Sequence, residues 1–389
     1  MKELENPYRP GAGTRPAALE GRDEYIDHFG TLLMRALNGS PGKSVMPIGL
    51  RGVGKTVLLN EFTRIAQAKG FSVASIEAPE EADLRVLLSR SLRKILLDFD
   101  SRKPSAIVLK ALRILKSFQM QLPDGTLISL DFDALKGQAD SGDLSEDLAD
   151  LLTAVGEAAQ DQGTGLLVAI DEVQYLTGGA LGALITAIHR TTQRDLPVVL
   201  VGAGLPQLPG LAGDAKSYAE RLFEFPLIGS LEPEDAAKAL TLPAYARGVE
   251  FEDAAVAKVV ESTQGYPYFL QEWGYHLWNR ASTSPIPASL VDDVTPAVTA
   301  NLDRNFFLVR YDRLTPKEKE YLYAMARLGT GPHRSGDIAA ELGVKVESVA
   351  PRRSGLIAKG MIYSPAHGDT AFTVPLFGEF MLRTFRAEE

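Results

Sequence analysis

Cysteine is absent from this chain of 389 residues. Its absence excludes disulfides, thiolate metal sites and a cysteine nucleophile, and it is typical of a cytoplasmic protein, which is the location we expect. Histidine is scarce. The histidines at positions 28, 189, 276, 333 and 367 do not have the spacing of a metal site, so we expect ordinary surface or core residues there.

Long apolar runs are also missing. No run approaches the ~18 consecutive apolar residues that a membrane span needs, so we expect no membrane partner. The opening MKELENPYRPGAGTRPAALEGR lacks the apolar segment of a secretory signal peptide. The net charge of −9 argues against general binding to polyanions and limits any nucleic-acid contact to a local patch.

The composition is that of a globular protein with more than one core. A length of 389 residues predicts two or three domains, and 45% hydrophobic with 23% charged residues is ordinary for such domains. The patterns below predict four segments. These are a core with an N-terminal arm (1–228, with an insertion at about 98–147), a helical segment (229–284), a linker with a helix (285–312) and a C-terminal module (313–389).

Apolar runs alternate with helical patterns in the first segment. SVMPIGL (44–50) and FSVASIEA (71–78) are strand-like and flank a helix. GLLVAIDEVQYL (165–176) and LPVVLVGAG (196–204) are runs expected of strands buried on both faces, with a helix at 180–194 between them. The order predicts a parallel α/β sheet. Pro47 has no N–H for a ladder bond, so we expect it near the end of its strand.

The segment 82–160 has a weaker pattern. Helices are predicted at 83–98 and 104–120, then a turn between short extended pieces in LPDGTLISLDFD, then a helix capped by Ser145. The helix in DSRKPSAIVLKALRILKSF is basic and amphipathic, which indicates a solvated basic face over a buried stripe, with a partner surface as the alternative. We assign no function to this segment.

The remaining segments are mostly helical. Helices are predicted at 232–248, 252–264 and 267–281 without a strand between them, and SPIPASL is a linker. Residues 315–389 are predicted to form helices followed by a short β-like end.

The segment GLRGVGKT matches the pattern G-x-x-x-x-G-K-[ST]. Backbone N–H groups of such a loop converge on phosphate oxygens, and the following helix adds the positive end of its dipole. A lysine supplies charge to the β and γ phosphates, and a threonine hydroxyl binds Mg²⁺. The alternative is a chance match in a glycine-rich turn. The candidate phosphate-binding residues are Gly49, Leu50, Arg51, Gly52, Val53, Gly54, Lys55, Thr56 and Val57.

An acidic pair, Asp171 and Glu172, ends the buried run LLVAI. Ligands bind at the carboxyl edge of parallel sheets, so the pair is expected beside the phosphate loop. Asp171 would then hold Mg²⁺ through water, the Thr56 hydroxyl would coordinate the ion, and Glu172 would polarise the attacking water. The alternative is a pair of helix-capping acids that face solvent.

These motifs, VVLVGAGLPQL and a C-terminal helix-turn-helix resemble the AAA+/STAND-related P-loop ATPases, in the branch of origin-recognition and archaeal ATPases. The resemblance implies a parallel-sheet P-loop core, an all-α lid and a C-terminal winged helix, with ATP and Mg²⁺ as cofactors. In that family a G-R-[DE] element lies beside the adenine, which implies a base pocket at Gly21, Arg22 and Tyr8, with Pro267 near the nucleotide. Arg221 resembles an arginine finger; the alternative is a surface arginine.

Two departures from the family favour a slow switch over a fast motor. The strand VVLVGAGLPQ ends without the polar residue that usually senses the γ-phosphate, and the lid helix opens TQGYPYFLQ rather than with a sensing arginine. No guanine-binding N-K-x-D motif is present.

The C-terminal segment SGDIAAELGVKVESVAPRRSGLIAKGMIYSP has the pattern of a helix-turn-helix, and MIYSPAHGDTAFTV that of a wing. Arg352, Arg353 and Lys359 are placed where a DNA-reading helix carries basic residues, which predicts duplex DNA binding through 335–370. From Arg313 onward 11 Lys and Arg stand against 9 Asp and Glu, a surplus of only +2. A protein-docking module is the alternative, and Pro351 fits a reading helix only in its first turn.

The sequence therefore predicts an ATP-binding and ATP-hydrolysing switch whose nucleotide state controls the C-terminal module. The alternative is a slow or non-hydrolysing regulator whose module docks a protein. Assembly into a homo-oligomer on ATP binding is a further expectation from the resemblance.

Overall fold

The computed structural model describes residues 1–389 except 12, 79–82, 121–132, 367 and 389. The chain divides into two compact units. We call Arg22–Gly49 with Lys55–Ile228 the sheet unit, and Met1–Gly21 with Leu50–Gly54 and Gly229–Glu389 the C-terminal unit. In the part of the chain that is described, no helix is both long and apolar enough to cross a membrane. The division into four segments stays a prediction.

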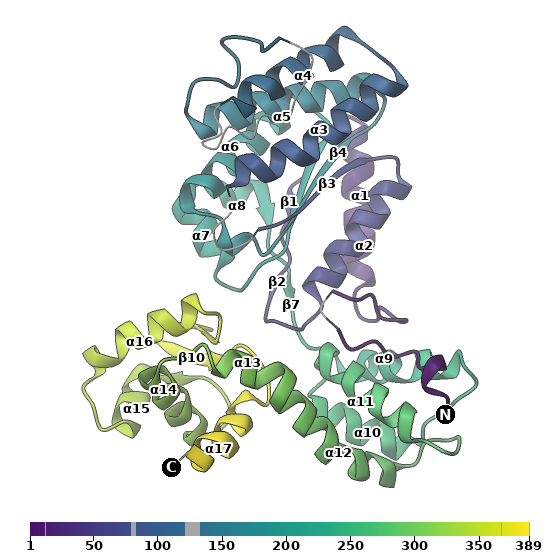
Figure 1. Ribbon diagram of the computed structural model, residues 1–389, viewed down its shortest axis with the longest axis vertical. Helices are drawn as coiled ribbons and strands as arrows, with labels where there is room; N and C mark the ends of the chain where they lie inside the picture. The colour runs from purple at the N-terminus through teal and green to yellow at the C-terminus, as the bar shows by residue number, and fades with distance from the viewer. Residues whose placement is uncertain (12, 79–82, 121–132, 367, 389) are drawn as a thin grey trace. The chain divides into compact units, whose positions relative to one another are not determined.

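A parallel sheet organises the sheet unit, as the alternating pattern predicts (Figure 1). Its two central strands, 166–171 and 198–202, are buried along almost their whole length because both faces are covered by helices, which explains their uninterrupted apolar runs. The register pairs Ile76 with Ile170 and Leu166 with Val198. The strand order is β3 (Ser72–Glu77), β4 (Leu166–Asp171), β5 (Val198–Gly202), β1 (Ser44–Val45) and β6 (Phe223–Glu224).

The run SVMPIGL forms two short strands instead of the single strand expected. β1 ends at Val45, and β2 (Ile48–Gly49) pairs with β7 (Leu227–Ile228). Pro47 lies between β1 and β2, where it has no N–H to donate. Its neighbours remain bonded, because Met46 donates to the Glu224 carbonyl and the Pro47 carbonyl accepts from Gly204. Pro47 thus interrupts the strand before the loop.

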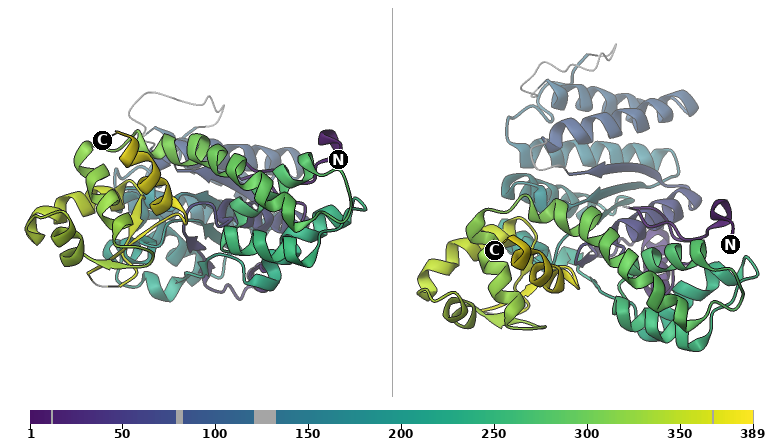
Figure 2. Two further views of the ribbon diagram at one scale, coloured as in Figure 1. Left: turned by 90° about the horizontal axis from the view of Figure 1, so that it is seen from below. Right: turned by 60° about the horizontal axis from the view of Figure 1, so that its bottom comes forward.

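Helices cover both faces of this sheet (Figures 1 and 2). One face carries α1 (Asp23–Leu37) and α2 (Lys55–Ala68). The other carries α3 (Leu84–Arg102), α5 (Leu144–Asp161) and α6 (Gly178–Gln193), with α4 (Ala106–Gln119) packed on α3 and α5. The turn η2 (Val173–Tyr175) and the short helices α7 (Leu208–Ala215) and α8 (Ala219–Leu222) complete the unit.

The helices predicted in 82–160 are present, with one correction. Asp143, not Ser145, caps α5, and its side chain accepts hydrogen bonds from the Ser145 and Glu146 backbones. Aspartate at this position satisfies two free N–H groups, which Ser145 inside the helix cannot do. Most of the predicted turn in LPDGTLISLDFD lies outside the described residues.

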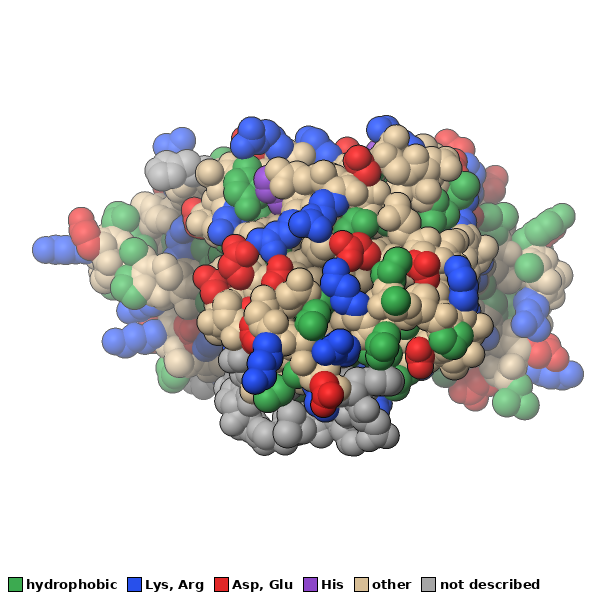
Figure 3. Space-filling model, turned by 90° about the horizontal axis from the view of Figure 1, so that it is seen from above, with side chains coloured by type: hydrophobic (Ala, Val, Ile, Leu, Met, Phe, Trp, Pro, Cys, Tyr) green, Lys and Arg blue, Asp and Glu red, His purple; other side chains and the backbone are tan. Residues whose placement is uncertain are grey.

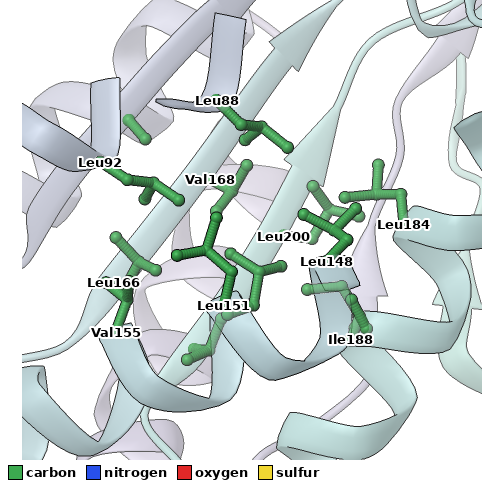
Figure 4. Close-up of a cluster of buried hydrophobic side chains, with 14 of the residues drawn as sticks. Leu88, Leu92, Leu148, Leu151, Val155, Leu166, Val168, Leu184, Ile188 and Leu200 are labelled. Atoms are coloured by element: carbon green, nitrogen blue, oxygen red, sulfur yellow. The ribbon is translucent and has the colours of Figure 1, made fainter. Parts of the chain in front are cut away.

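The core between the sheet and α3, α5 and α6 is built from aliphatic side chains (Figure 4). Leu92, Leu151 and Leu200 have no exposed surface, and each contributes about 1.5–3 kcal/mol of transfer free energy. Outside this core, basic and acidic side chains are interspersed on the face over α4 (Figure 3). Lys110 lies 3.5 Å from Glu157, for example, so this face has the mixed charge of a solvated surface.

The C-terminal unit begins with a bundle of helices that the N-terminal arm joins. The Tyr8 hydroxyl donates to the Leu240 carbonyl, and the Trp278 indole donates to the Lys2 carbonyl. The arm, expected to belong with the core, therefore packs on the helices at Pro233–Tyr245 and Pro267–Arg280. The elements are η1 (Glu3–Glu5), α9 (Pro233–Tyr245), α10 (Asp253–Thr263), α11 (Pro267–Arg280), α12 (Ala288–Leu302), the π-helical turn η3 (Asp303–Phe307) and α13 (Leu308–Tyr311).

The last segment of the C-terminal unit combines helices with a small antiparallel sheet of order β8-β10-β9. The short extended runs expected after the helices are present at Ile362–Tyr363 and Asp369–Phe372. A helix at Phe377–Glu388 follows them and was not expected, although the apolar residues of FGEFMLRTFRAE recur at helical spacing. Its elements are α14 (Pro316–Arg327), β8 (His333–Arg334), α15 (Ser335–Glu341), α16 (Val346–Ala358), β9 (Ile362–Tyr363), β10 (Asp369–Phe372) and α17 (Phe377–Glu388).

Candidate nucleotide site

The loop between β2 and α2 uses glycines in conformations that other residues rarely adopt. Gly52 and Gly54 have φ of 87° and 95°. A Cβ on Gly52 would lie 2.8 Å from Cε1 of Tyr266, whereas nothing lies within 4 Å of one on Gly54. Gly54 is therefore required by its backbone, and Gly52 by its backbone and by the ring beside it.

The helix that follows the loop in the sequence begins at the lysine of the motif. α2 begins at Lys55, whose side chain is only 6% exposed, and it packs on β3 and β4. The first N–H groups of a helix have no partner within the helix, so this terminus favours an anion. A buried lysine adds a full positive charge at the same point.

The threonine hydroxyl of the loop motif reaches the acid at the end of β4. Thr56 Oγ1 donates to Asp171 Oδ2 at 2.7 Å. Burial, and then the nearby Glu172 carboxylate, raise the pKa of Asp171 above its usual value, although the Thr56 hydrogen bond and Lys55 oppose the shift. A bound cation would stabilise the charged form of this partly desolvated carboxylate.

These two side chains fit a magnesium ion. Both contribute oxygen atoms, which Mg²⁺ prefers, and the 2.7 Å contact places the two oxygens where one ion can be shared. No cluster of three or more acidic, histidine or cysteine ligands occurs among the described residues. A site with few protein ligands suits Mg²⁺, which usually keeps waters and takes phosphate oxygens.

Glu172 is held in a left-handed turn directly after β4. Its φ is 54°, and its N–H donates to Asp171 Oδ1 at 2.9 Å. The Glu172 carboxylate accepts a hydrogen bond from Gln174 Nε2. Gln174 was not among the residues predicted from the sequence, although it is a polar residue within the run DEVQYL.

Two further residues that were not predicted from the sequence belong to the C-terminal unit, as do loop residues 50–54. Tyr266 precedes α11, and its hydroxyl is buried without a hydrogen-bond partner among the described residues. The guanidinium of Arg310 lies 4.0 Å from the centre of the Phe306 ring. Burial, and then repulsion from Arg51, lower the pKa of Arg310 from its usual range. A tyrosine hydroxyl and two guanidiniums thus gather by the loop.

Several residues expected to line a base pocket contact other parts of the protein. Tyr8 is 2% exposed, and its ring fills the space above Gly274, so the packing of α9 and α11 accounts for it. Pro267 begins α11, but Tyr266 is the neighbour of loop residue Gly52. Arg22 is buried and precedes α1, while Gly21 lies beside Asp235 of α9. Arg221 is exposed on α8.

The three basic residues expected to contact DNA have partners within the C-terminal unit. Arg352 lies 3.5 Å from Glu320, and Lys359 donates to Glu318 at 2.7 Å. Arg353 donates to side chains or carbonyls of β10 and the segment before it. Pro351 lies past the first turn of α16. These contacts within the C-terminal unit give all three basic residues a structural role that does not require DNA.

Two parts of the chain match family models. Residues 18–201 match the family model of an AAA ATPase domain, and residues 304–381 match a domain of unknown function (DUF8462). No curated protein matches the chain.

Several solved structures are similar to this chain over most of its length. A Walker-type ATPase of Pyrococcus abyssi is 17% identical with a TM-score of 0.61, over 96% of this chain and 98% of its own. The RuvB Holliday junction branch migration motor of Thermotoga maritima is 16% identical with a TM-score of 0.47, over 92% and 95%. The Aeropyrum pernix ORC1 protein, solved with DNA, is 16% identical with a TM-score of 0.44, over 96% and 95%. Residues 18–201 are therefore similar to an AAA ATPase domain, and the chain shares the fold of the Pyrococcus abyssi Walker-type ATPase.

Proposed function

We propose that the chain binds and hydrolyses ATP with Mg²⁺ and acts as an AAA+-type switch. One observation carries the proposal: the Thr56 hydroxyl donates to the Asp171 carboxylate at 2.7 Å, at the carboxyl end of a parallel strand. This contact brings the phosphate-loop motif and the acidic pair, 115 positions apart in the sequence, to one point. The match of 18–201 to an AAA ATPase domain supports it.

Each residue has a role in this proposal. Backbone N–H groups of 49–57 hold the phosphates, and Lys55 neutralises charge at the β and γ positions. Thr56 and Asp171 hold Mg²⁺, which supplies charge neutralisation when bound. Glu172 orients and polarises the attacking water.

Two variants test the proposal. Lys55→Ala removes a charged contact worth about 1.5–3 kcal/mol, so ATP affinity falls about 10- to 100-fold. Glu172→Gln keeps ATP binding and lowers hydrolysis about 10²- to 10⁴-fold. Affinity is measured by titration with a fluorescent ATP analogue, and hydrolysis by phosphate release in Mg²⁺ and in EDTA. Lys69→Ala, an exposed lysine just after α2, is the matched control. Wild-type values in Lys55→Ala would refute the proposal.

The nucleotide base and the assembly are tested separately. Adenine preference is inferred from the resemblance and the absence of N-K-x-D, so ATP should displace the analogue better than GTP. If Arg22 contributes to that preference, Arg22→Ala reduces it. Arg221 is a proposed finger toward a second copy, so the elution volume in size-exclusion chromatography should fall when ATP is added. An unchanged monomer would exclude that role.

We infer that the module from 313 onward is a winged helix. The order α14, β8, α15, α16, β9, β10, with β9 and β10 antiparallel, supports this inference. Its role as a duplex DNA binder is one candidate. Docking of a protein partner is the second, and it is favoured by the internal ion pairs of Arg352 and Lys359, which leave their charges engaged.

Salt dependence separates the two candidates. A DNA-binding module loses affinity linearly in log[salt], with a slope near −0.9 for each phosphate neutralised. Fluorescence anisotropy with a duplex at several salt concentrations measures it. Arg352→Ala/Arg353→Ala should reduce the slope by about two if both residues contact phosphates. Absence of binding at low salt would exclude the DNA role and leave protein docking.

A further inference from the structure

Gln174 connects the Glu172 carboxylate with the end of the neighbouring strand. Its Nε2 donates to Glu172 Oε2, and its Oε1 accepts from the Leu205 backbone at 3.1 Å. Both ends of the amide are therefore bonded. Rotating the amide by 180° would place oxygen against carboxylate and NH₂ against N–H, so only one orientation satisfies both partners.

The surrounding backbone fixes the direction of this side chain. Val173 donates to the Ala203 carbonyl at 2.9 Å, and Tyr175 donates to the Glu172 carbonyl at 3.0 Å. The first bond holds the turn η2 against the segment after β5, and the second closes the turn itself. A Cβ on Gly204 would lie 3.0 Å from Gln174 Oε1, so the glycine leaves room for the amide.

The segment after β5 also contacts the start of the phosphate-loop motif. Gly49 donates to the Gly204 carbonyl at 3.1 Å, and Gly204 donates to the Pro47 carbonyl at 3.1 Å. A continuous set of bonds therefore runs from Gly49 through 204–205 and Gln174 to the Glu172 carboxylate. The end of β5 carries no polar side chain, because residues 202–204 are Gly, Ala and Gly.

We propose that Gln174 is a positioning residue that holds the Glu172 carboxylate and couples it to the segment after β5. The proposal rests on the proposed ATPase function, in which Glu172 orients the attacking water. Gln174 supplies from the η2 turn the polar contact that the β5 strand end lacks. A displacement of about 1 Å at a reacting group costs up to ~100-fold in rate, so loss of this contact should act on turnover and not on binding.

The kinetic test uses Gln174→Met, which keeps the length of the side chain and removes both hydrogen bonds. We expect kcat to fall about 10- to 100-fold with KM changed less than about threefold. The double variant with Glu172→Gln should be no slower than Glu172→Gln alone, because the contact then has nothing left to position. Gln207→Met, whose glutamine forms no cap hydrogen bond with α7, is the matched control. Unchanged kcat in Gln174→Met would overturn the proposal.

Hydrogen exchange tests the coupling without requiring hydrolysis. Gln174→Met removes the acceptor of the Leu205 amide, so that amide should exchange about tenfold faster. Glu172→Ala should also speed exchange at Leu205, because the amide of Gln174 then loses one of its two anchors. A wild type without ATPase activity but with both exchange effects would refute the proposed function and leave the coupling intact. If the wild type hydrolyses ATP but Glu172→Ala leaves exchange at Leu205 unchanged, the coupling is refuted and the proposed function is not.

Discussion

Replacement of Tyr266 by phenylalanine should stabilise the protein in the absence of nucleotide. The Tyr266 side chain is 1% exposed, and its hydroxyl has no hydrogen-bond partner among the described residues. Burial raises the pKa of this hydroxyl well above its usual value, so it stays protonated. An unsatisfied buried hydroxyl costs about 1–3 kcal/mol, and phenylalanine retains the ring that packs beside Phe269.

The expected gain is about 1–2 kcal/mol, because the ring packing is kept and only the hydroxyl is removed. For a unit of fewer than 200 residues this corresponds to a rise of about 2–8 °C in Tm. Scanning calorimetry without nucleotide measures the rise. If the two units unfold in separate transitions, the transition whose Tm changes in Tyr266→Phe is assigned to the C-terminal unit.

Tyr268→Phe is the matched control and should do the opposite. The Tyr268 hydroxyl donates at 2.9 Å to Glu272, whose carboxylate is buried and also accepts from Asn301. Removing a hydrogen bond to a charged group costs about 1.5–3 kcal/mol, so Tm falls. A Tm for Tyr266→Phe at or below that of the wild type would mean that the hydroxyl has a partner in solution, and the reasoning would be wrong.

Three further predictions follow from other contacts. Lys359→Met removes the ion pair that lowers the pKa of Glu318 against the effect of burial; it should cost about 1–3 kcal/mol in urea unfolding at pH 7, with Lys345→Met near zero. Because a lowered carboxyl pKa stabilises the fold only above that pKa, the cost should shrink as pH falls below about 4, and a constant cost would contradict the assignment. Gly52→Ala should lower affinity for the fluorescent ATP analogue at least tenfold (roughly 1.4 kcal/mol), because φ of 87° and the Tyr266 ring both oppose a side chain; wild-type affinity would count against the loop conformation. Leu151→Ala should cost about 2–5 kcal/mol in the same urea assay, whereas Leu109→Ala, 39% exposed on α4, should cost less than about 1.

The sequence was sufficient for features that local pattern determines. β4 and β5 were predictable because strands covered on both faces must be apolar throughout. The helices from α9 to α11 were predictable from spacing. The proximity of Thr56 and Asp171 was predictable because the motif and the acidic pair both lie at the carboxyl ends of parallel strands, and the Thr56–Asp171 hydrogen bond joins them. The roles of Lys55, Thr56, Asp171 and Glu172 stay predictions.

Features that depend on distant partners were not predictable. Gln174 gains its position from the Leu205 backbone, 31 residues later, and nothing in its local sequence encodes that bond. Tyr8 is fixed by Leu240 and Gly274, so its place in a helical bundle could not be inferred from a Pro- and Gly-rich arm. The break at Pro47 depends on bonds to the β6–β7 segment. Asp143 and Ser145 are both good caps, and the fold selects one.

The anchoring of the arm has a practical consequence for handling the protein. A Cβ on Gly274 would lie 2.4 Å from the Tyr8 ring, and Asn6 donates to the Tyr275 carbonyl at 3.1 Å. Protease treatment that removes the first ten residues would expose the apolar surface of α11 around Gly274 that the Tyr8 ring covers, and exposed apolar surface favours aggregation. Affinity tags are therefore better fused after α17, and a trimmed sample should be recognised by its increased dye binding before any assay is interpreted.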